Sequence, residues 1–225
     1  MQRTRIVLTL AAFAASVAGL GQAPPAPAAR STPAPVQHID SPLGHTAVEV
    51  GGHYGQPEKP GYRPRYEGGK WIEIAYYRPI KRGRADLFGS GADYAKYLNA
   101  GAPVWRAGAN VTTRMKTDVA LEIGGKRLEP GDYTLFVDLK ENAWTLIVSR
   151  QPWQKNYDAK DKTATWGSFN YDPKYDVVRA PMKNEKMNHS LEEFMIDFVD
   201  VTEKDGKLAM WWDKEFATTD FKILN

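Results

Sequence analysis

Residues 131–149 read GDYTLFVDLKENAWTLIVS, and this stretch decides the fold class. Two runs rich in β-branched and aromatic residues, 132–139 and 143–149, are separated by the polar tripeptide KEN. Two such runs with a three-residue polar break predict a β-hairpin. We therefore expect antiparallel sheet in the middle of the chain.

Alternation with a period of two continues on both sides of this hairpin. Ile72, Ile74 and Tyr76 alternate with other residues, as a half-buried strand would, and Val119, Leu121 and Ile123 do the same. Further β-rich runs lie at 175–178, 194–201, 208–212 and 221–224. A short helix is expected over 93–98 (DYAKYL), and no helical segment is long enough for a crossover between parallel strands. The pattern predicts an all-β fold, a single antiparallel β-sandwich that is jelly-roll-like, with one short helix. A small β-barrel is the alternative.

The first residues have the pattern of a secretory signal. Arg3 and Arg5 precede an uncharged apolar run over 6–20, which is short of the roughly 20 residues that span a bilayer. We expect a signal peptide over 1–23, although cleavage anywhere from about residue 18 to about residue 29 fits the pattern. The expected location is periplasmic or secreted, with no stable membrane span after cleavage. An uncleaved membrane anchor is the alternative.

Two segments rich in proline or glycine divide the remainder. Residues 24–40 carry prolines among alanine, serine and threonine, which predicts an extended Pro/Ala-rich linker. The β-sandwich domain is expected over 41–225. Within it, the glycine- and proline-rich stretch 53–69 predicts a long loop inserted between two strands.

Composition excludes several classes of function. The 225 residues contain no cysteine, which excludes disulfide scaffolds, thiolate metal sites and cysteine nucleophiles. The formal charge of +3 falls to +1 without Arg3 and Arg5, so bulk charge gives no argument for nucleic acid. The common signatures of serine hydrolases, nucleotide-binding loops and zinc proteases are missing from the sequence, and its four histidines lack metal-ligand spacing. We expect no metal and no cofactor.

Four arginines form the most informative polar pattern. Arg78, Arg84, Arg106 and Arg179 lie at or near predicted junctions between strands and loops. In a sandwich we expect these junctions to cluster at one end, and a guanidinium binds carboxylate, sulfate or phosphate through two parallel hydrogen bonds. The pattern is consistent with an anion-binding pocket. Ion pairs with nearby acidic residues are the alternative.

The order of several motifs resembles the bacterial domain-of-unknown-function family 2911. They are YYRP (76–79), RGR (82–84), VWRAGAN (104–110), GKRLEPGDYTLF (125–136) and WGSFNYDPKYDVVR (166–179). The resemblance implies an exported, all-β, single-domain protein with no assigned activity. This chain departs from the family at Val111, where the family usually carries an acidic residue. It also carries what look like insertions over 53–69 and 90–103.

The matching positions include polar and aromatic residues that a purely structural motif would not require. From them we expect a shared polar site, or a buried network of arginine, aspartate and tryptophan. The candidate ligand-binding residues are Arg78, Arg84, Trp105, Arg106, Asn110, Trp166, Tyr171, Asp176 and Arg179.

Three functions remain open at this stage. The first is a non-catalytic exported sandwich that binds a small anionic or carbohydrate ligand or a protein partner. The second is a hydrolase with paired carboxylates such as Asp176 and Glu192. The third is a structural interaction module.

Overall fold

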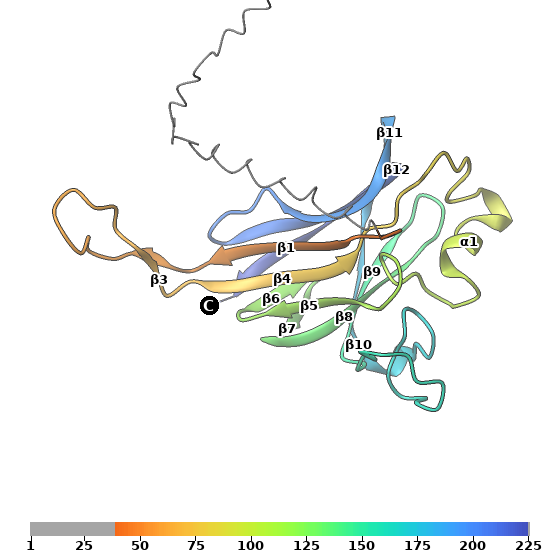
Figure 1. The fold of residues 1–225 in the computed structure, drawn as a ribbon, viewed down its shortest axis with the longest axis horizontal. Coiled ribbons are helices and arrows are strands. Elements are labelled where there is room, and N and C mark those ends of the chain that lie inside the picture. Colours follow the sequence, from red (N-terminus) through yellow and green to blue (C-terminus); the bar gives the residue numbers. More distant parts are fainter. Residues whose placement is uncertain (1–38, 225) are drawn as a thin grey trace, which may run out of the picture. The chain divides into compact units, whose positions relative to one another are not determined.

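The computed structural model describes residues 39–224, which form two packed antiparallel β-sheets and a small separate hairpin (Figure 1). The larger sheet has six strands in the order β1 (Leu43–Val50), β4 (Lys70–Tyr77), β5 (Thr113–Thr117), β8 (Gly131–Asp138), β9 (Thr145–Ser149) and β10 (Asp176–Pro181). The smaller sheet has four, in the order β11 (Lys183–Val199), β12 (Asp205–Leu224), β6 (Ala120–Ile123) and β7 (Lys126–Leu128). The predicted all-β sandwich is confirmed. The predicted signal peptide and most of the predicted linker lie outside the described residues.

The connectivity is mostly a meander. In the larger sheet, β4 pairs with β5, and β8, β9 and β10 pair in succession. Between β5 and β8 the chain leaves for the smaller sheet and forms the β6–β7 hairpin there. Because most neighbours are consecutive in the chain, the topology differs from the two Greek keys of a jelly roll.

The hairpin over 131–149 forms as expected. Leu135 lies opposite Val148 and Phe136 lies opposite Ile147 in the register of β8 with β9. Both faces of this hairpin are buried, because the long segment after β9 covers the outer face and places Tyr171 against Phe136. That cover explains why the sequence here is almost continuously apolar.

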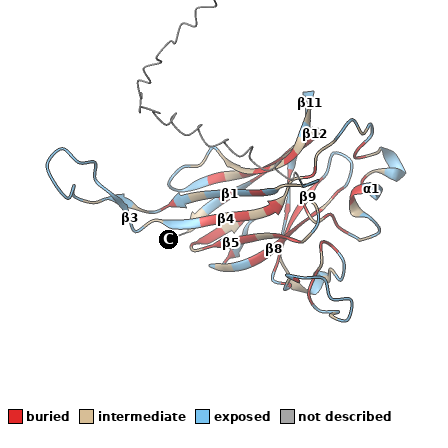
Figure 2. Cartoon of the chain, in the orientation of Figure 1, coloured by how far each residue is buried: buried red, intermediate tan, exposed pale blue. Residues whose placement is uncertain are grey.

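The main core lies between the two sheets and combines aliphatic side chains with several large aromatic rings. Figure 2 marks the buried residues along the strands. Trp105, Trp144, Trp212 and Phe194 are almost fully buried. The rings of Trp105 and Trp212 stack with centroids 6.3 Å apart and planes 11° apart. Large buried aromatic side chains contribute strongly to stability, which suits a chain without disulfides.

Side-chain hydrogen bonds join the two sheets where β1 and β4 pass β11. The buried Tyr76 hydroxyl accepts from the Ile196 amide at 2.9 Å and donates to the Ile196 carbonyl at 3.2 Å. Burial raises the pKa of Tyr76. Thr46 donates its hydroxyl hydrogen to Asp197. These bonds satisfy polar groups that the packing of the sheets would otherwise leave without partners.

Two details correct the expected elements. The predicted helix is split: a 3₁₀ turn (Gly91–Asp93) precedes α1 (Lys96–Asn99), and Ala95, with φ of 63°, interrupts them. The stretch 53–69 is not wholly a loop, because β2 (His53–Tyr54) pairs with β3 (Tyr66–Glu67). This hairpin extends beyond the ends of β1 and β4 (Figure 1).

The remaining regular element is a second 3₁₀ turn (Pro173–Tyr175), which leads into β10. Within the part of the chain that the structure describes, no helix has the length and apolar character needed to cross a bilayer.

Candidate functional site

The four arginines singled out from the sequence do not converge on one pocket. Arg84 and Arg106 line the same cleft at the end of the sandwich that carries α1. Arg78 pairs with Glu193 at 3.1 Å, and Arg179 belongs to a separate network on β10. Of the four arginines expected to form one pocket, only Arg84 and Arg106 therefore line the same cleft.

We call this cleft the arginine cleft, and its volume is about 600 Å³. It is bordered by the segment after β4, the segment around α1, the VWRAGAN segment and β12. Its lining residues are Asp40, Ser41, Pro79, Ile80, Arg82, Arg84, Tyr97, Leu98, Ala100, Trp105, Arg106, Gly108, Ala109 and Trp212. Two motifs that carried the family resemblance, RGR and VWRAGAN, thus border one cavity.

Arg84 is held firmly on one side of the cleft. Its Nε and Nη2 donate to the backbone carbonyls of Lys81 and Ile80 at 2.9 and 2.6 Å. Its Nη1 donates to the Tyr97 hydroxyl at 2.8 Å, and the guanidinium lies 5.5 Å from the Tyr97 ring centre and 5.6 Å from that of Trp212. Three of its five N–H donors are used, so two are left for a ligand.

Arg106 is the least compensated cation of the cleft. Its Nη1 donates to the carbonyl of Asn110 at 3.0 Å, and Asn110 adopts a left-handed backbone with φ of 58°. No carboxylate of residues 39–224 forms an ion pair with Arg106, and residues 1–38 contain neither Asp nor Glu. Burial lowers the pKa of Arg106, which is the expected effect of removing a cation from water without giving it an anion.

The other charges of the cleft nearly cancel each other. Arg82 pairs with Asp40 at 2.8 Å, and Asp40 is the one acidic residue among the lining residues. The cleft therefore carries the charges of Arg84 and Arg106 without an opposing carboxylate. Such a site is suited to binding a carboxylate, sulfate or phosphate group.

Trp105 supports the cleft from beneath. Its ring is 1% exposed and packs edge to face on Phe194, with centroids 4.7 Å apart. Its backbone bonds to Val137 in both directions at 2.8 Å, which fixes the chain just before Arg106. Trp105 is therefore a core residue that positions the cleft.

Tyr171, Asp176 and Arg179 form a separate network on the large sheet. The Tyr171 hydroxyl donates to Asp176 Oδ2 at 2.6 Å, and Arg179 donates to the same oxygen at 2.9 Å and to Asp138 at 3.1 Å. Burial, together with the hydrogen bond that the hydroxyl donates to Asp176, raises the pKa of Tyr171. Through Asp176 Oδ2 this group ties the long segment after β9 to the sheet, while Asp176 Oδ1 is buried without a hydrogen-bond partner.

Trp166 lies outside the arginine cleft. Its ring is 5.8 Å from that of Tyr157, and its backbone bridges to Phe169. The next residue, Gly167, contacts Arg106 closely, and a methyl group there would lie 2.6 Å from Arg106 Nη1. The WGSF segment therefore acts as a wall behind the guanidinium.

The paired carboxylates expected of a hydrolase are not brought together. Asp176 is held by Tyr171 and Arg179, whereas Glu192 accepts a hydrogen bond from the Arg82 amide at 2.9 Å. None of the clefts found over residues 39–224 is lined by both. Within the same residues, no group of three or more His, Cys, Asp or Glu side chains is placed to hold a metal ion.

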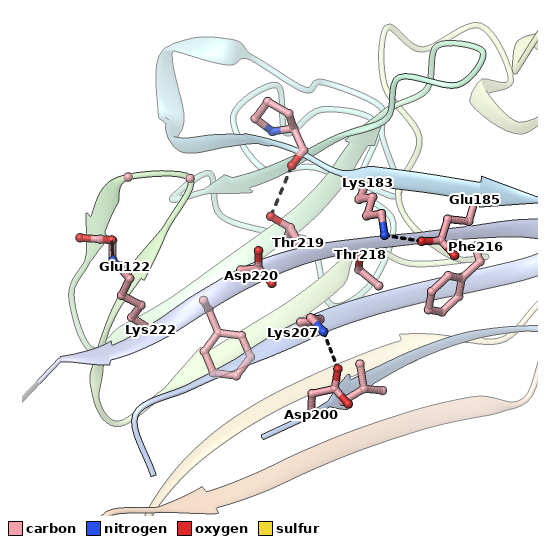
Figure 3. A pocket seen from close by; sticks show the side chains of 15 residues that line it. Glu122, Lys183, Glu185, Asp200, Lys207, Phe216, Thr218, Thr219, Asp220 and Lys222 are labelled. Carbon is pink, nitrogen blue, oxygen red and sulfur yellow. Dashed lines mark hydrogen bonds and ion pairs between the residues drawn. The ribbon is translucent and has the colours of Figure 1, made fainter. Parts of the chain in front are cut away.

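A second depression lies on the outer face of the smaller sheet (Figure 3). Its lysines are paired: Lys207 with Asp200 at 2.5 Å, Lys183 with Glu185 at 2.7 Å, and Lys222 with Glu122 at 2.8 Å. These exposed pairs neutralise one another, so this face presents no uncompensated cation comparable with Arg106.

Sequence reasoning missed three features of the arginine cleft. Tyr97 was visible only as part of a predicted helix, and Trp212 only as part of a strand face. Gly167 carried no signal beyond its place in a matching motif. A contact between segments this far apart in the chain leaves no local pattern.

Comparison with known proteins identifies a family and no relative of known activity. The family model described as "Protein of unknown function (DUF2911)" matches residues 62–221, which confirms the resemblance seen in the motifs. No curated protein and no solved structure matches the chain.

Proposed function

We propose, from the premise that this chain belongs to the DUF2911 family of proteins of unknown function, that it is a non-catalytic binding protein for a small anion-bearing molecule. The arginine cleft is the proposed site. The observation that carries the proposal is Arg106, a half-buried guanidinium without an ion-pair partner among residues 39–224. We also propose export, which rests on the pattern of residues 1–23.

The lining favours a ligand with an apolar body beside its anionic group. Arg84 and Arg106 supply unused N–H donors, while Tyr97, Leu98 and Ile80 supply aromatic and aliphatic surface. Ligand pockets commonly combine a mostly apolar wall with a few fixed polar groups in this way. Phenyl phosphate has both parts and serves as the probe.

The test is ligand-induced thermal stabilisation of the purified chain by phenyl phosphate. A ligand at about 100 times its Kd stabilises a protein by about 2.7 kcal/mol. Arg106→Gln should abolish the stabilisation and leave the fold intact. Arg127→Gln is the matched control, because Arg127 is exposed and pairs with Glu129 at 2.6 Å outside the cleft.

Phenol and inorganic phosphate separate the two parts of the probe, and each should stabilise less than phenyl phosphate. The proposal fails if Arg106→Gln retains the stabilisation. It also fails if Arg106→Gln unfolds the protein, since Arg106 would then be a structural residue.

A further inference from the structure

A groove lies on the outer face of the six-stranded sheet, away from the arginine cleft. Its volume is about 460 Å³, and it shares no lining residue with that cleft. Figure 2 shows the alternation of burial along β4 and β5, whose buried residues face the core. The residues between them face outward and form the floor. We call this the sheet groove.

The floor consists of two rows of side chains that run across the strands. One row holds His45, Ala75, Arg114 and Thr134, which are successive partners in the register of β1, β4, β5 and β8. The neighbouring row holds Glu73, Lys116 and Asp132. Small Ala75 leaves room beside Arg114.

The segment after β9 forms the wall of the groove. The Gln151 side chain donates to the carbonyls of Thr163 and Asn170 at 2.9 and 2.6 Å, and accepts from the Asp172 amide at 2.9 Å. Its hydrogen-bonding capacity is used within the protein, so Gln151 fixes this segment in place. Trp153 follows two residues later and lines the groove.

Arg114 is the polar centre of the groove. Its guanidinium carbon lies 4.2 Å from the centre of the Trp153 ring, so the ring holds the cation from one side. Its Nε is buried without a hydrogen-bond partner, and no carboxylate of residues 39–224 forms an ion pair with it. Arg150, at the rim, is exposed and likewise lacks an ion pair within that range.

The groove also carries acceptors that reduce its attraction for a strongly negative ligand. Glu73 and Asp132 lie in the row beside Arg114, and His45 Nε2 is 3.4 Å from Glu73. Against the cations of Arg114, Lys116 and Arg150 these carboxylates leave only a small positive excess, which suits one anionic group better than a polyanion such as an acidic peptide. They accept hydrogen bonds from hydroxyl groups, and the arginines accommodate one carboxylate.

We propose that the sheet groove is a second binding site, specific for an acidic sugar with one carboxylate and several hydroxyl groups. The carboxylate lies on Arg114 and Arg150, and the hydroxyl groups face Glu73 and Asp132. A neutral sugar would leave Arg114 without an anion. A simple anion would leave the two carboxylates without donors.

The experiment is chemical-shift mapping by NMR on the purified chain, with D-glucuronate as the probe. The Trp153 indole N–H and the Ala75 and Thr134 amides should shift, with a Kd on the order of 1 mM for a single sugar unit. D-glucose and inorganic phosphate should each bind at least about tenfold more weakly, because each satisfies part of the site.

Variants then test which residues bind. Arg114→Gln should weaken glucuronate binding about tenfold or more. Arg150→Gln should weaken it severalfold, and it provides the test at an exposed side chain if Arg114→Gln fails to fold. Arg127→Gln is the control and should leave the affinity unchanged. Arg106→Gln should also leave it unchanged, so failure of the arginine cleft and failure of the sheet groove are separate results.

Four results would overturn the proposal. The first is that glucuronate shifts no signal of the sheet groove in the wild-type chain. The second is that phosphate or glucose binds as tightly as glucuronate, and the third is that both variants at Arg114 and Arg150 keep wild-type affinity. The fourth is tighter binding of triglutamate, which would identify an acidic peptide as the ligand.

Discussion

Gly167→Ala should displace the Arg106 guanidinium while leaving the fold in place. Gly167 has φ of +62°, where an L-residue costs about 1–2 kcal/mol. The new methyl group would lie 2.6 Å from Arg106 Nη1 and 3.2 Å from the Asn110 carbonyl oxygen. Because Nη1 is the far end of a flexible side chain, it moves at small cost and gives up its hydrogen bond to Asn110, worth about 1 kcal/mol.

A second glycine with positive φ separates the backbone cost of the substitution from the displacement of Arg106. Gly125 has φ of +70°, and a methyl group added there would have no neighbouring atom within 4 Å, so Gly125→Ala carries the backbone cost alone. Urea denaturation should show a loss of about 1–2 kcal/mol for Gly125→Ala and about 2–3 kcal/mol for Gly167→Ala. In an Arg106→Ala background, the cost of Gly167→Ala should fall toward that of Gly125→Ala, because the guanidinium is gone and only the contact with the Asn110 carbonyl oxygen remains.

The binding assay gives the sharper contrast. Gly167→Ala should remove the stabilisation by phenyl phosphate, whereas Gly125→Ala should keep it. Equal loss of stability in the two variants, combined with unchanged phenyl phosphate binding, would refute the view that Gly167 positions Arg106.

Trp105→Ala should lower the free energy of unfolding by about 3–5 kcal/mol, because the side chain is 1% exposed and packs between Phe194 and Trp212. Chemical denaturation measures this loss, and a value below about 1 kcal/mol would contradict the place of Trp105 in the core. Burial raises the pKa of Tyr94 from 10.0 to about 12. The folded state therefore favours the neutral tyrosine, and this stabilisation is fully present below pH 10. It is lost as the pH rises from 10 to 12. Tyr94→Phe should therefore make the alkaline loss of stability shallower and should cost about 1 kcal/mol at neutral pH, since Trp144 Nε1 loses its acceptor at 2.8 Å. The free energy of unfolding of both proteins, measured between about pH 9 and about pH 12, checks this prediction. An equally steep loss of stability in Tyr94→Phe and the wild-type chain would count against it.

The strands could be predicted because their signals are local. The hairpin over 131–149 depends on composition and on a short polar break within one segment, and it formed where expected. The short β2–β3 pairing was missed because it joins the two ends of the stretch 53–69, where His53 lies opposite Glu67 and Tyr54 opposite Tyr66. The Tyr66 hydroxyl also accepts from the Gly52 amide at 3.0 Å. Strands of two residues have no periodicity to read.

The partners of the arginines could not be predicted, because each lies far away in sequence. Arg78 finds Glu193 on β11, which is 115 residues later in the numbering. Arg84 stacks near Trp212 on β12, and Arg114 stacks on Trp153. The residue types indicated that each arginine either binds an anion or forms an ion pair. Only the fold shows which arginines have a carboxylate partner and which do not.

Strand β12 has a consequence for the order in which the protein folds. Its first part pairs with β11, and its last residues pair with β6, where Leu224 lies opposite Ala120. The smaller sheet therefore cannot close during synthesis until β12 has left the ribosome, although the β8–β9 hairpin can form much earlier.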